Sequence, residues 1–315
     1  RQTLIIQDAA RQAVLRAAPQ GRWSASDQLD STGPGVDQQH PATLCCEVTI
    51  DHGDRDGPTI TFDFTGTDPQ RSGNTNAVRA VTESAVAYAV RSVLDPTLPA
   101  NAGVMRPVRV VTAEGSVVDA RFPVAVGAGN VEVSQRVVDV CCRALAEVLP
   151  SRVPAASQGT MNNLLIGGPG VRSGPGGEAE PWVYYETVGG GQGGRPPRPG
   201  DRSRTPLPGQ SGIHTAMTNT RNTPIEALER AFPLRVLRYR LRRGSGGAGW
   251  SAGGEGIERD LQVLEDATVS LITERRVSQP WGLAGGEPGA VGRTGCCQAA
   301  TRPEPSASPT SARSI

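Results

Sequence analysis

The sequence predicts an α+β fold, with mixed sheets and hairpins, several long helices and glycine-rich loops. Segments with helical periodicity, segments that alternate apolar and polar residues, and stretches rich in glycine and proline follow one another without the regular order of βαβ units. With 315 residues, of which 37% are hydrophobic, the chain is long enough to bury the core of one large domain or two smaller ones.

The N-terminal third predicts a helix, a hairpin and a second helix. Apolar residues recur on one helical face over residues 4–18. Residues 43–50 and 59–64 alternate between apolar and polar side chains, and the segment between them carries aspartate and glycine suited to a turn, which predicts a β-hairpin. A helical period over 77–94 ends before Asp95-Pro96, because proline disfavours the helical conformation of the residue before it.

The middle of the chain continues in the same mixed pattern. Residues 108–112 predict a strand, and about 132–149 predict a long helix that stops at Pro150. Residues 182–187 are a short aromatic strand by composition. The glycine- and proline-rich segment 189–212 favours no packed element, so we expect a long loop there, functional or mobile.

The last third predicts one helix and three strands. Thr223, Pro224 and Glu226 match the cap, first and third positions of a helix N-terminus. Residues 237–242 alternate apolar side chains with arginines, which predicts a strand with one solvated face. A glycine-rich turn at 244–256 separates it from strands at 257–264 and 268–273.

Charge limits the chemistry that the chain can perform. All 32 basic residues are arginines, they nearly balance 31 acidic residues, and there is no lysine. A net charge of +1 gives no electrostatic footprint for nucleic acid or an anionic membrane. Without lysine, the glycine run at 244–249 does not match a phosphate-binding P-loop, and no Schiff base can form. If ATP is used, we expect a partner to bind it.

The six cysteines occur as three adjacent pairs. The pairs are 45/46, 141/142 and 296/297, and neighbouring side chains on a helix or strand point apart, so they do not match a zinc knuckle or a redox dithiol. We expect reduced thiols and therefore a cytoplasmic protein. No apolar stretch reaches the length of a membrane span.

His214 is the best candidate for a proton carrier. The other histidines, His40 and His52, fit solvated loop and turn positions. His214 opens a run of hydrogen-bonding residues that includes Asn219, Arg221 and Asn222 and leads into the predicted helix N-terminus, which offers N–H donors to an anion or a polarised carbonyl. The alternative is a loop whose asparagines and threonines satisfy one another. No catalytic triad can be assembled around a single histidine.

Further candidates lie next to glycines. Asn162 and Asn163 could bind a substrate amide or simply form a turn, and Glu186 could be a general base, a metal ligand or a surface carboxylate. Asp68 could be an oxygen ligand for a divalent cation, although a turn or capping role is the more usual one. The arginines of 237–242 could bind phosphate or cover a solvated face, and residues 274–276 fit ordinary surface ion pairs.

Six segments, taken together, resemble the hydantoinase B/5-oxoprolinase family. They are residues 63–68 (DFTGTD), 128–132 (AGNVE), 156–163 (ASQGTMNN), 184–187 (YYET) with the following glycines, 218–226 (TNTRNTPIE) and 243–247 (RGSGG). Their order agrees with the family from about residue 1 to 293. The chain is therefore identified as resembling the C-terminal part of a B-type subunit, which is also related to subunits of acetone and acetophenone carboxylases.

The resemblance implies ATP-dependent opening of a hydantoin or 5-oxoproline ring. In that reaction an A-type partner subunit, which binds ATP with Mg²⁺, phosphorylates the amide oxygen before the ring is hydrolysed. In this scheme His214, Arg221 and Glu186 would be catalytic, and Asn162, Asn163, Asn219 and Asn222 would bind the substrate. Carboxylase chemistry on a ketone and a non-catalytic remnant are the alternatives.

Two departures from the family pattern bear on the extent of the site. The N-terminal family portion with a histidine- and aspartate-rich metal motif has no counterpart here, so we expect an N-terminally truncated region over 1–293 without that metal site. Residues 294–315 lack periodicity. If suitable codons are chosen for them and read one nucleotide earlier, the translation resembles the continuation of the family. We hypothesise a frameshift, which predicts that this tail is disordered and carries no function.

Overall fold

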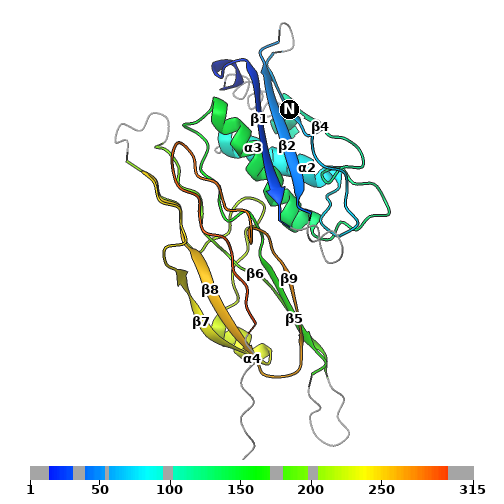
Figure 1. The fold of residues 1–315 in the computed structure, drawn as a ribbon, viewed down its shortest axis with the longest axis vertical. Helices are drawn as coiled ribbons and strands as arrows, with labels where there is room; N and C mark the ends of the chain where they lie inside the picture. The colour runs from blue at the N-terminus through cyan, green and yellow to red at the C-terminus, as the bar shows by residue number, and fades with distance from the viewer. Residues whose placement is uncertain are drawn as a thin grey trace, which may run out of the picture.

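The computed structural model describes residues 14–30, 40–53, 57–94, 102–170, 180–197 and 205–296. The molecule is elongated, with a four-stranded sheet and the two long helices in one half and a set of smaller sheets in the other (Figure 1). The mixed sheets and helices confirm the α+β prediction. No helix among the described residues is long and apolar enough to cross a bilayer.

The larger sheet has the order β1-β2-β3-β4. Its strands are β1 (Gly21–Leu29), β2 (Ala42–Asp51), β3 (Thr59–Asp63) and β4 (Val108–Val111), antiparallel except for the parallel pair β3–β4. The pairs β1–β2 and β2–β3 are hairpin-like, and alternate residues of β2 are fully buried, as the alternating sequence predicted. The predicted β2–β3 hairpin and the β4 strand are thus confirmed.

Strand β1 was missed because its sequence carries almost no apolar alternation. Only its last residue, Leu29, is buried, while Trp23 and Ala25 pack against the core from half-buried positions. The strand is stabilised by its pairing with β2 from Gly21 to Leu29. The local sequence pattern does not predict this pairing. The predicted helix over 4–18 is described only at 14–18, of which 14–17 are helical, and residues 4–13 lie outside the described residues.

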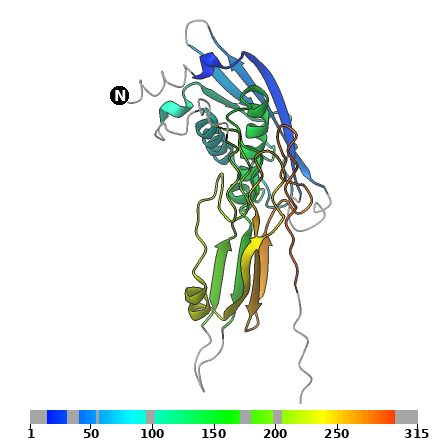
Figure 2. The ribbon, with the colours of Figure 1, turned by 90° about the vertical axis from the view of Figure 1, so that its left-hand side faces the viewer.

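Two helices cover one face of this sheet (Figure 2). The first is α2 (Arg79–Leu94), and a short 3₁₀ turn, η2 (Ala102–Met105), precedes β4. The second begins as a π-helical turn, η3 (Gly129–Val133), and continues as α3 (Ser134–Val148), which packs against β1, β2 and α2. Both helix predictions are confirmed, and α3 is buried along nearly its whole length.

The other half contains a three-stranded sheet and a two-stranded ribbon. The sheet has the order β6-β5-β9, with β5 (Asn163–Gly168), β6 (Trp182–Thr187) and β9 (Thr268–Ile272). The ribbon pairs β7 (Leu234–Arg242) with β8 (Gly256–Val263). A small apolar cluster around Ile166 and Tyr184 joins the sheet to α4 (Ile225–Ala231) and the ribbon. The strand predictions hold, but β5, with only three apolar residues in a row, was missed.

The predicted cap of α4 is wrong. The helix begins at Ile225, and Pro224 occupies the cap position with φ −54° and ψ 139°, an extended conformation, without any side-chain capping hydrogen bond. Pro224 thus takes the position that the local pattern assigned to Thr223, and proline offers no side-chain acceptor for the first N–H groups of the helix.

Strand β7 does not have the single solvated face that its alternation predicted. A register shift between Val236 and Arg238 interrupts the ladder, and Leu237 and Tyr239 are exposed together with the arginines. Arg238 and Arg240 form exposed ion pairs with Glu258 and Asp260 of β8. Because the ribbon has only two strands, it cannot bury the apolar side chains on both of its faces.

The described residues of the glycine-rich segment 189–212 form no helix or strand, as predicted, yet they are packed. Bridges join Gly190 to Ile213 and Arg195 to Leu207. A Cβ atom at Gly193 would overlap the carbonyl oxygen of Ala155, and one at Gly190 would overlap the side chain of Gln158. Backbones approach this closely only where side chains are absent, so the glycines serve packing here.

A buried ionic network joins the two halves of the molecule. Arg136 of α3 lies between Asp27, Asp139 and Glu274 at 3.4–3.5 Å, and Arg275 binds Asp27 and Asp139 at 2.7 Å. The prediction that residues 274–276 form ordinary surface pairs is therefore wrong for Glu274 and Arg275, which are both buried. Their partners lie more than a hundred residues away in the sequence, out of reach of any local pattern.

The described cysteines are all free thiols. Cys46 and Cys141 are buried, Cys45 and Cys142 are partly buried, and Cys296 is exposed. Cys297 and the rest of the tail lie outside the described residues, so the disorder of the tail stays a prediction.

Candidate functional site

Four of the predicted site residues surround one open cavity. His214, Asn219, Arg221 and Asn222 line a hollow of about 590 Å³, together with Tyr239 of β7 and the segment that leads into α4. His214 follows the glycine-rich segment, and the other three lie just before the helix. The loop places them together because the bridge between Gly190 and Ile213 fixes the start of the run and α4 fixes its end.

His214 is held between two threonine hydroxyls. Its Nδ1 lies 3.3 Å from Thr218 Oγ1 and its Nε2 lies 3.3 Å from Thr220 Oγ1. Thr220 also hydrogen-bonds Thr187 at the end of β6. Burial lowers the pKa of His214 below its usual 6.5, against an opposing effect of the Glu186 carboxylate. The imidazole is therefore neutral at neutral pH and able to accept a proton.

Glu186 lies beneath this cavity and is buried. Its Oε1 accepts hydrogen bonds from Arg259 Nη1 at 2.6 Å and from Asn222 Nδ2 at 2.5 Å. Asn222 also donates to the Thr187 carbonyl and accepts from the Tyr239 hydroxyl, and the Arg259 guanidinium lies over the Tyr239 ring. The surface-carboxylate alternative for Glu186 is thus excluded: this carboxylate orients Asn222 from below.

Arg221 and Asn219 are exposed at the rim of the cavity. Among the described residues, Arg221 has no carboxylate within salt-bridge distance. A guanidinium at the mouth of a hollow with a neutral histidine inside is suited to attracting an anionic or strongly polarised group.

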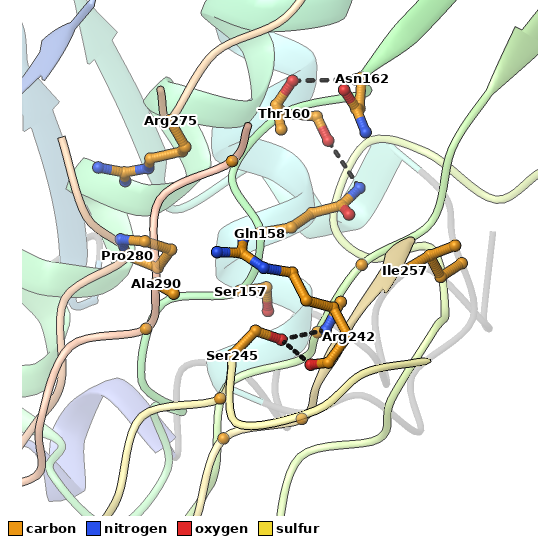
Figure 3. Close-up of a pocket in the computed structure, with 18 of the residues that line it drawn as sticks. Ser157, Gln158, Thr160, Asn162, Arg242, Ser245, Ile257, Arg275, Pro280 and Ala290 are labelled. Carbon is orange, nitrogen blue, oxygen red and sulfur yellow. Dashed lines mark hydrogen bonds between the residues drawn. The ribbon is translucent and has the colours of Figure 1, made fainter. Parts of the chain in front are cut away.

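The two remaining asparagines lie elsewhere. Asn162 lines a larger cavity of about 1670 Å³, between the β6-β5-β9 sheet, the β7–β8 ribbon and the glycine-rich loops (Figure 3). Its backbone has φ 55°, and its Oδ1 accepts a hydrogen bond from Arg276 Nη2 at 2.7 Å. Asn163 is buried on the opposite face of β5, where its Oδ1 accepts from the Tyr185 hydroxyl at 2.9 Å. The structure thus divides the predicted substrate-binding asparagines between separate places.

Asp68 is committed to structural contacts. Its Oδ2 accepts from the Thr43 backbone N–H at 3.0 Å and pairs with Arg71 at 2.8 Å. Within the ranges that the structure describes, no three His, Cys, Asp or Glu side chains gather as a metal centre would require. We therefore propose no metal at Asp68.

Sequence reasoning missed the residues that hold the site from outside the His214 run. Arg259 and Tyr239 sit on strands as ordinary alternating residues, and their local sequence carries no sign of the partners they find. Glu132, which is buried beside Thr160 and Asn162, did stand in a family-like segment but received no role.

Three comparisons place the chain among known proteins. It is 44% identical over 233 residues to an uncharacterized protein of Methanocaldococcus jannaschii, covering 74% of this chain and 38% of that protein. It is 39% identical over 278 residues to 5-oxoprolinase 1 of Arabidopsis thaliana, covering 85% and 20%. A putative B-type subunit of a D-/L-hydantoinase from a Pseudomonas species is 31% identical over 287 residues, covering 88% and 44%. The chain thus spans less than half the length of these relatives.

Solved structures share the fold at low sequence identity. Acetone carboxylase in its nucleotide-free form matches with a TM-score of 0.71 at 23% identity, over 90% of this chain and 38% of that one. The ATP-dependent caprolactamase from Pseudomonas jessenii matches with 0.66 at 20% identity, over 92% and 50%. The family model of hydantoinase B/oxoprolinase matches residues 5–312, beyond the boundary at 293, which stays a prediction. The chain belongs to the hydantoinase B/oxoprolinase family.

Proposed function

We propose that this chain is part of a B-type subunit or region that opens a cyclic amide, a hydantoin or 5-oxoproline, with ATP hydrolysed on an A-type partner. Family membership and the 5-oxoprolinase relatives support a hydrolase. The relative named as one subunit of a hydantoinase supports a separate partner chain. Because the chain has no lysine for a Walker-type phosphate loop, the partner supplies the site for ATP and Mg²⁺.

The arrangement around His214 is the observation that carries the proposal. Once the amide oxygen is phosphorylated, the ring carbon is attacked by water, and a base must accept the proton of that water. His214 is neutral at neutral pH, held by Thr218 and Thr220, and open to a cavity. Arg221 at the rim would neutralise a carboxylate or phosphoryl group, while Asn219 and Asn222 would hold ring amides.

Glu186 and Arg259 support this role from below. The two charges neutralise each other in a buried pair, so Glu186 orients Asn222 and leaves His214 as the proton acceptor. In this proposal Asn162 and Asn163 are outside the His214 cavity, and they contribute to the family reaction only through the larger cavity or the packing of β5.

The test uses a full-length relative assembled with its A-type partner. His214→Ala and Arg221→Ala, made at the corresponding positions, should each lower ATP-dependent ring opening by at least about a hundredfold. The matched control is Arg230→Ala, an exposed arginine in the last turn of α4 and outside the cavity, which should retain activity. Activity near the unmodified level in both His214 and Arg221 variants would rule the assignment out.

The second candidate is a subunit of an ATP-dependent carboxylase, supported by the shared fold of acetone carboxylase. It would show turnover that depends on bicarbonate and a ketone, whereas the ring-opening enzyme would not. A remnant without catalytic function would give no activity with either substrate class when the A-type partner is present.

A further inference from the structure

Two half-buried arginines at the larger cavity differ in their partners from three arginines with buried side chains. Arg136, Arg259 and Arg275 each contact at least one carboxylate within 3.5 Å. Arg242 and Arg276 line the larger cavity, and neither has a carboxylate within salt-bridge distance among the described residues. Buried or half-buried charges are ordinarily paired, because desolvation without a counter-charge is costly.

The two unpaired guanidinium groups are near each other and held in place. The Arg242 side chain extends toward the Ser157–Gln158 segment across the cavity (Figure 3). Its Nη1 donates to the Val291 carbonyl at 2.7 Å, and Ser245 Oγ fixes the turn by donating to the Arg242 carbonyl. Burial lowers the pKa of Arg276, and repulsion from Arg242 acts in the same direction. The carboxylates of Glu132, Asp30 and Glu274 oppose this effect without outweighing it.

Arg276 still has donors available. Its Nη2 donates to Asn162 Oδ1 at 2.7 Å and its Nη1 donates to the Glu274 carbonyl at 3.3 Å. Its Nε is buried and has no hydrogen-bond partner among the described residues. A planar fork of N–H donors whose two partners are both neutral matches the geometry of a carboxylate or phosphoryl group.

We propose that the larger cavity is an oxyanion-binding site in which Arg242 and Arg276 together bind a carboxylate or phosphoryl group. This site is separate from the His214 cavity, and its existence does not depend on the proposed ring opening. A bound anion would place a negative charge within salt-bridge distance, which neither arginine has among the described residues, and would relieve their mutual repulsion.

Glu132 makes the site sensitive to pH. It is buried in the π-helical turn beside Thr160 and the Asn162 backbone, which influence its pKa, although neither makes a hydrogen bond of normal geometry to its carboxyl oxygens. The charged or titratable groups around it are Arg136, Glu274, Arg276 and Tyr185. Burial raises the pKa of Glu132 to about 8. Above that pH its negative charge offsets Arg276, so anions should bind less tightly.

The experiment titrates this chain with sulfate and with acetate, whose charges do not change between about pH 6 and pH 10. The readout is the indole N–H signals in a ¹⁵N–¹H spectrum at constant ionic strength. Trp250 and Trp281 line the cavity and should shift saturably, whereas Trp23 packs against the core of the four-stranded sheet and should not. Sulfate binding tighter than acetate would point to a phosphoryl group as the natural ligand, and the reverse would point to a carboxylate.

Three variants decide the proposal. Arg242→Met should weaken saturable binding by about tenfold or more, while the control Arg240→Met, an exposed arginine paired with Glu258 on the same strand, should leave it unchanged. Glu132→Gln should abolish the roughly tenfold loss of affinity between about pH 6 and pH 10 that the unmodified chain should show. The proposal is overturned if neither anion binds saturably near pH 6, or if Arg242→Met binds as tightly as the unmodified chain.

Discussion

At the scale of single residues, Arg136 shows how strongly charge pairing shapes this molecule. Its side chain is fully buried, and three carboxylates lie within 3.5 Å of its guanidinium group. Burial alone would raise the pKa of Asp27, but the charges of Arg136 and Arg275 outweigh burial and lower it. In this network each buried charge is balanced by charges of opposite sign, so removing one member leaves a buried charge without its counter-charge.

We expect Arg136→Met to lower the free energy of unfolding by about 3–5 kcal/mol, because it leaves buried carboxylates with too few counter-charges. Urea unfolding at neutral pH measures the change. The matched control is Arg240→Met, which removes a largely exposed ion pair with Glu258 and should cost less than about 1 kcal/mol. Equal effects of the two substitutions would mean that the buried network contributes no more than a surface pair.

Glu132 gives a pH dependence of opposite sign to that of an ordinary paired carboxylate. Its pKa is raised from 4.5 to about 8 by burial, so the folded chain keeps a proton that the unfolded chain releases across this window. The free energy of unfolding should therefore fall as pH rises from about 4.5 to 8. Glu132→Gln removes this titration, and its stability relative to the unmodified chain should grow by a few kcal/mol over that range. Parallel stability profiles from urea unfolding at a series of pH values would contradict the assignment.

At the scale of elements, periodicity predicted the long helices and the hairpin, because each buries one face against a neighbour. The sequence did not predict strands β1 and β5, because both are stabilised by pairing with neighbouring strands. Most positions of β1 are polar, and β5 has a three-residue apolar run followed by glycines. The predicted cap of α4 was wrong because Pro224, which has no side-chain acceptor, occupies the cap position instead of Thr223.

The glycine-rich segment offers an element-scale prediction. Gly193→Ala should destabilise the fold by about 3 kcal/mol, because the new Cβ would overlap the Ala155 carbonyl oxygen and force two backbone segments apart. Gly295→Ala is the matched control, since a Cβ there meets nothing within 4 Å. Thermal unfolding of both variants measures the difference. If Gly193→Ala unfolds like the control, the segment is not packed as described.

At the scale of the whole molecule, Asp30 links the two halves. It follows β1, and its carboxylate accepts backbone N–H groups of Arg276, Val277 and Ser278, which follow β9. Burial would raise the pKa of Asp30, but the Ser278 side chain and these backbone donors outweigh it, so the pKa is lowered. The stability that Asp30 contributes is present above the unfolded-state value of 3.8 and is lost as the pH falls through its lower folded-state value.

Asp30→Ala should uncouple the two halves. Hydrogen exchange of amides in β1–β4 and in β5, β6 and β9 should report one common opening free energy in the unmodified chain and two different ones in the variant. Asp51→Ala is the control, because the Asp51 carboxylate accepts the N–H of Gly53 in its own turn and no other hydrogen bond from the part of the chain that the structure describes. Coincident exchange in Asp30→Ala would show that the remaining contacts suffice to join the halves.

The candidate site was predictable in part. The run from His214 to Asn222 could be recognised because histidine, asparagine and arginine gather before a helix in a single stretch of chain, and the structure brings four of these residues around one cavity. Asn162 and Asn163 were predicted to join them, but adjacent residues at the start of a strand point to opposite sides, which sends one into the larger cavity and the other into the packed interior.

The sequence by itself determined the α+β class, the long helices, the absence of lysine and the residue types around His214, because these depend on composition and local periodicity. Only the tertiary structure decided which charges are paired. Glu186 with Arg259, Asp27 with Arg275, and the unpaired Arg242 beside Arg276 are set by contacts between distant segments. Coulombic and desolvation energies depend on distance in space and on burial, and neither can be read from order along the chain.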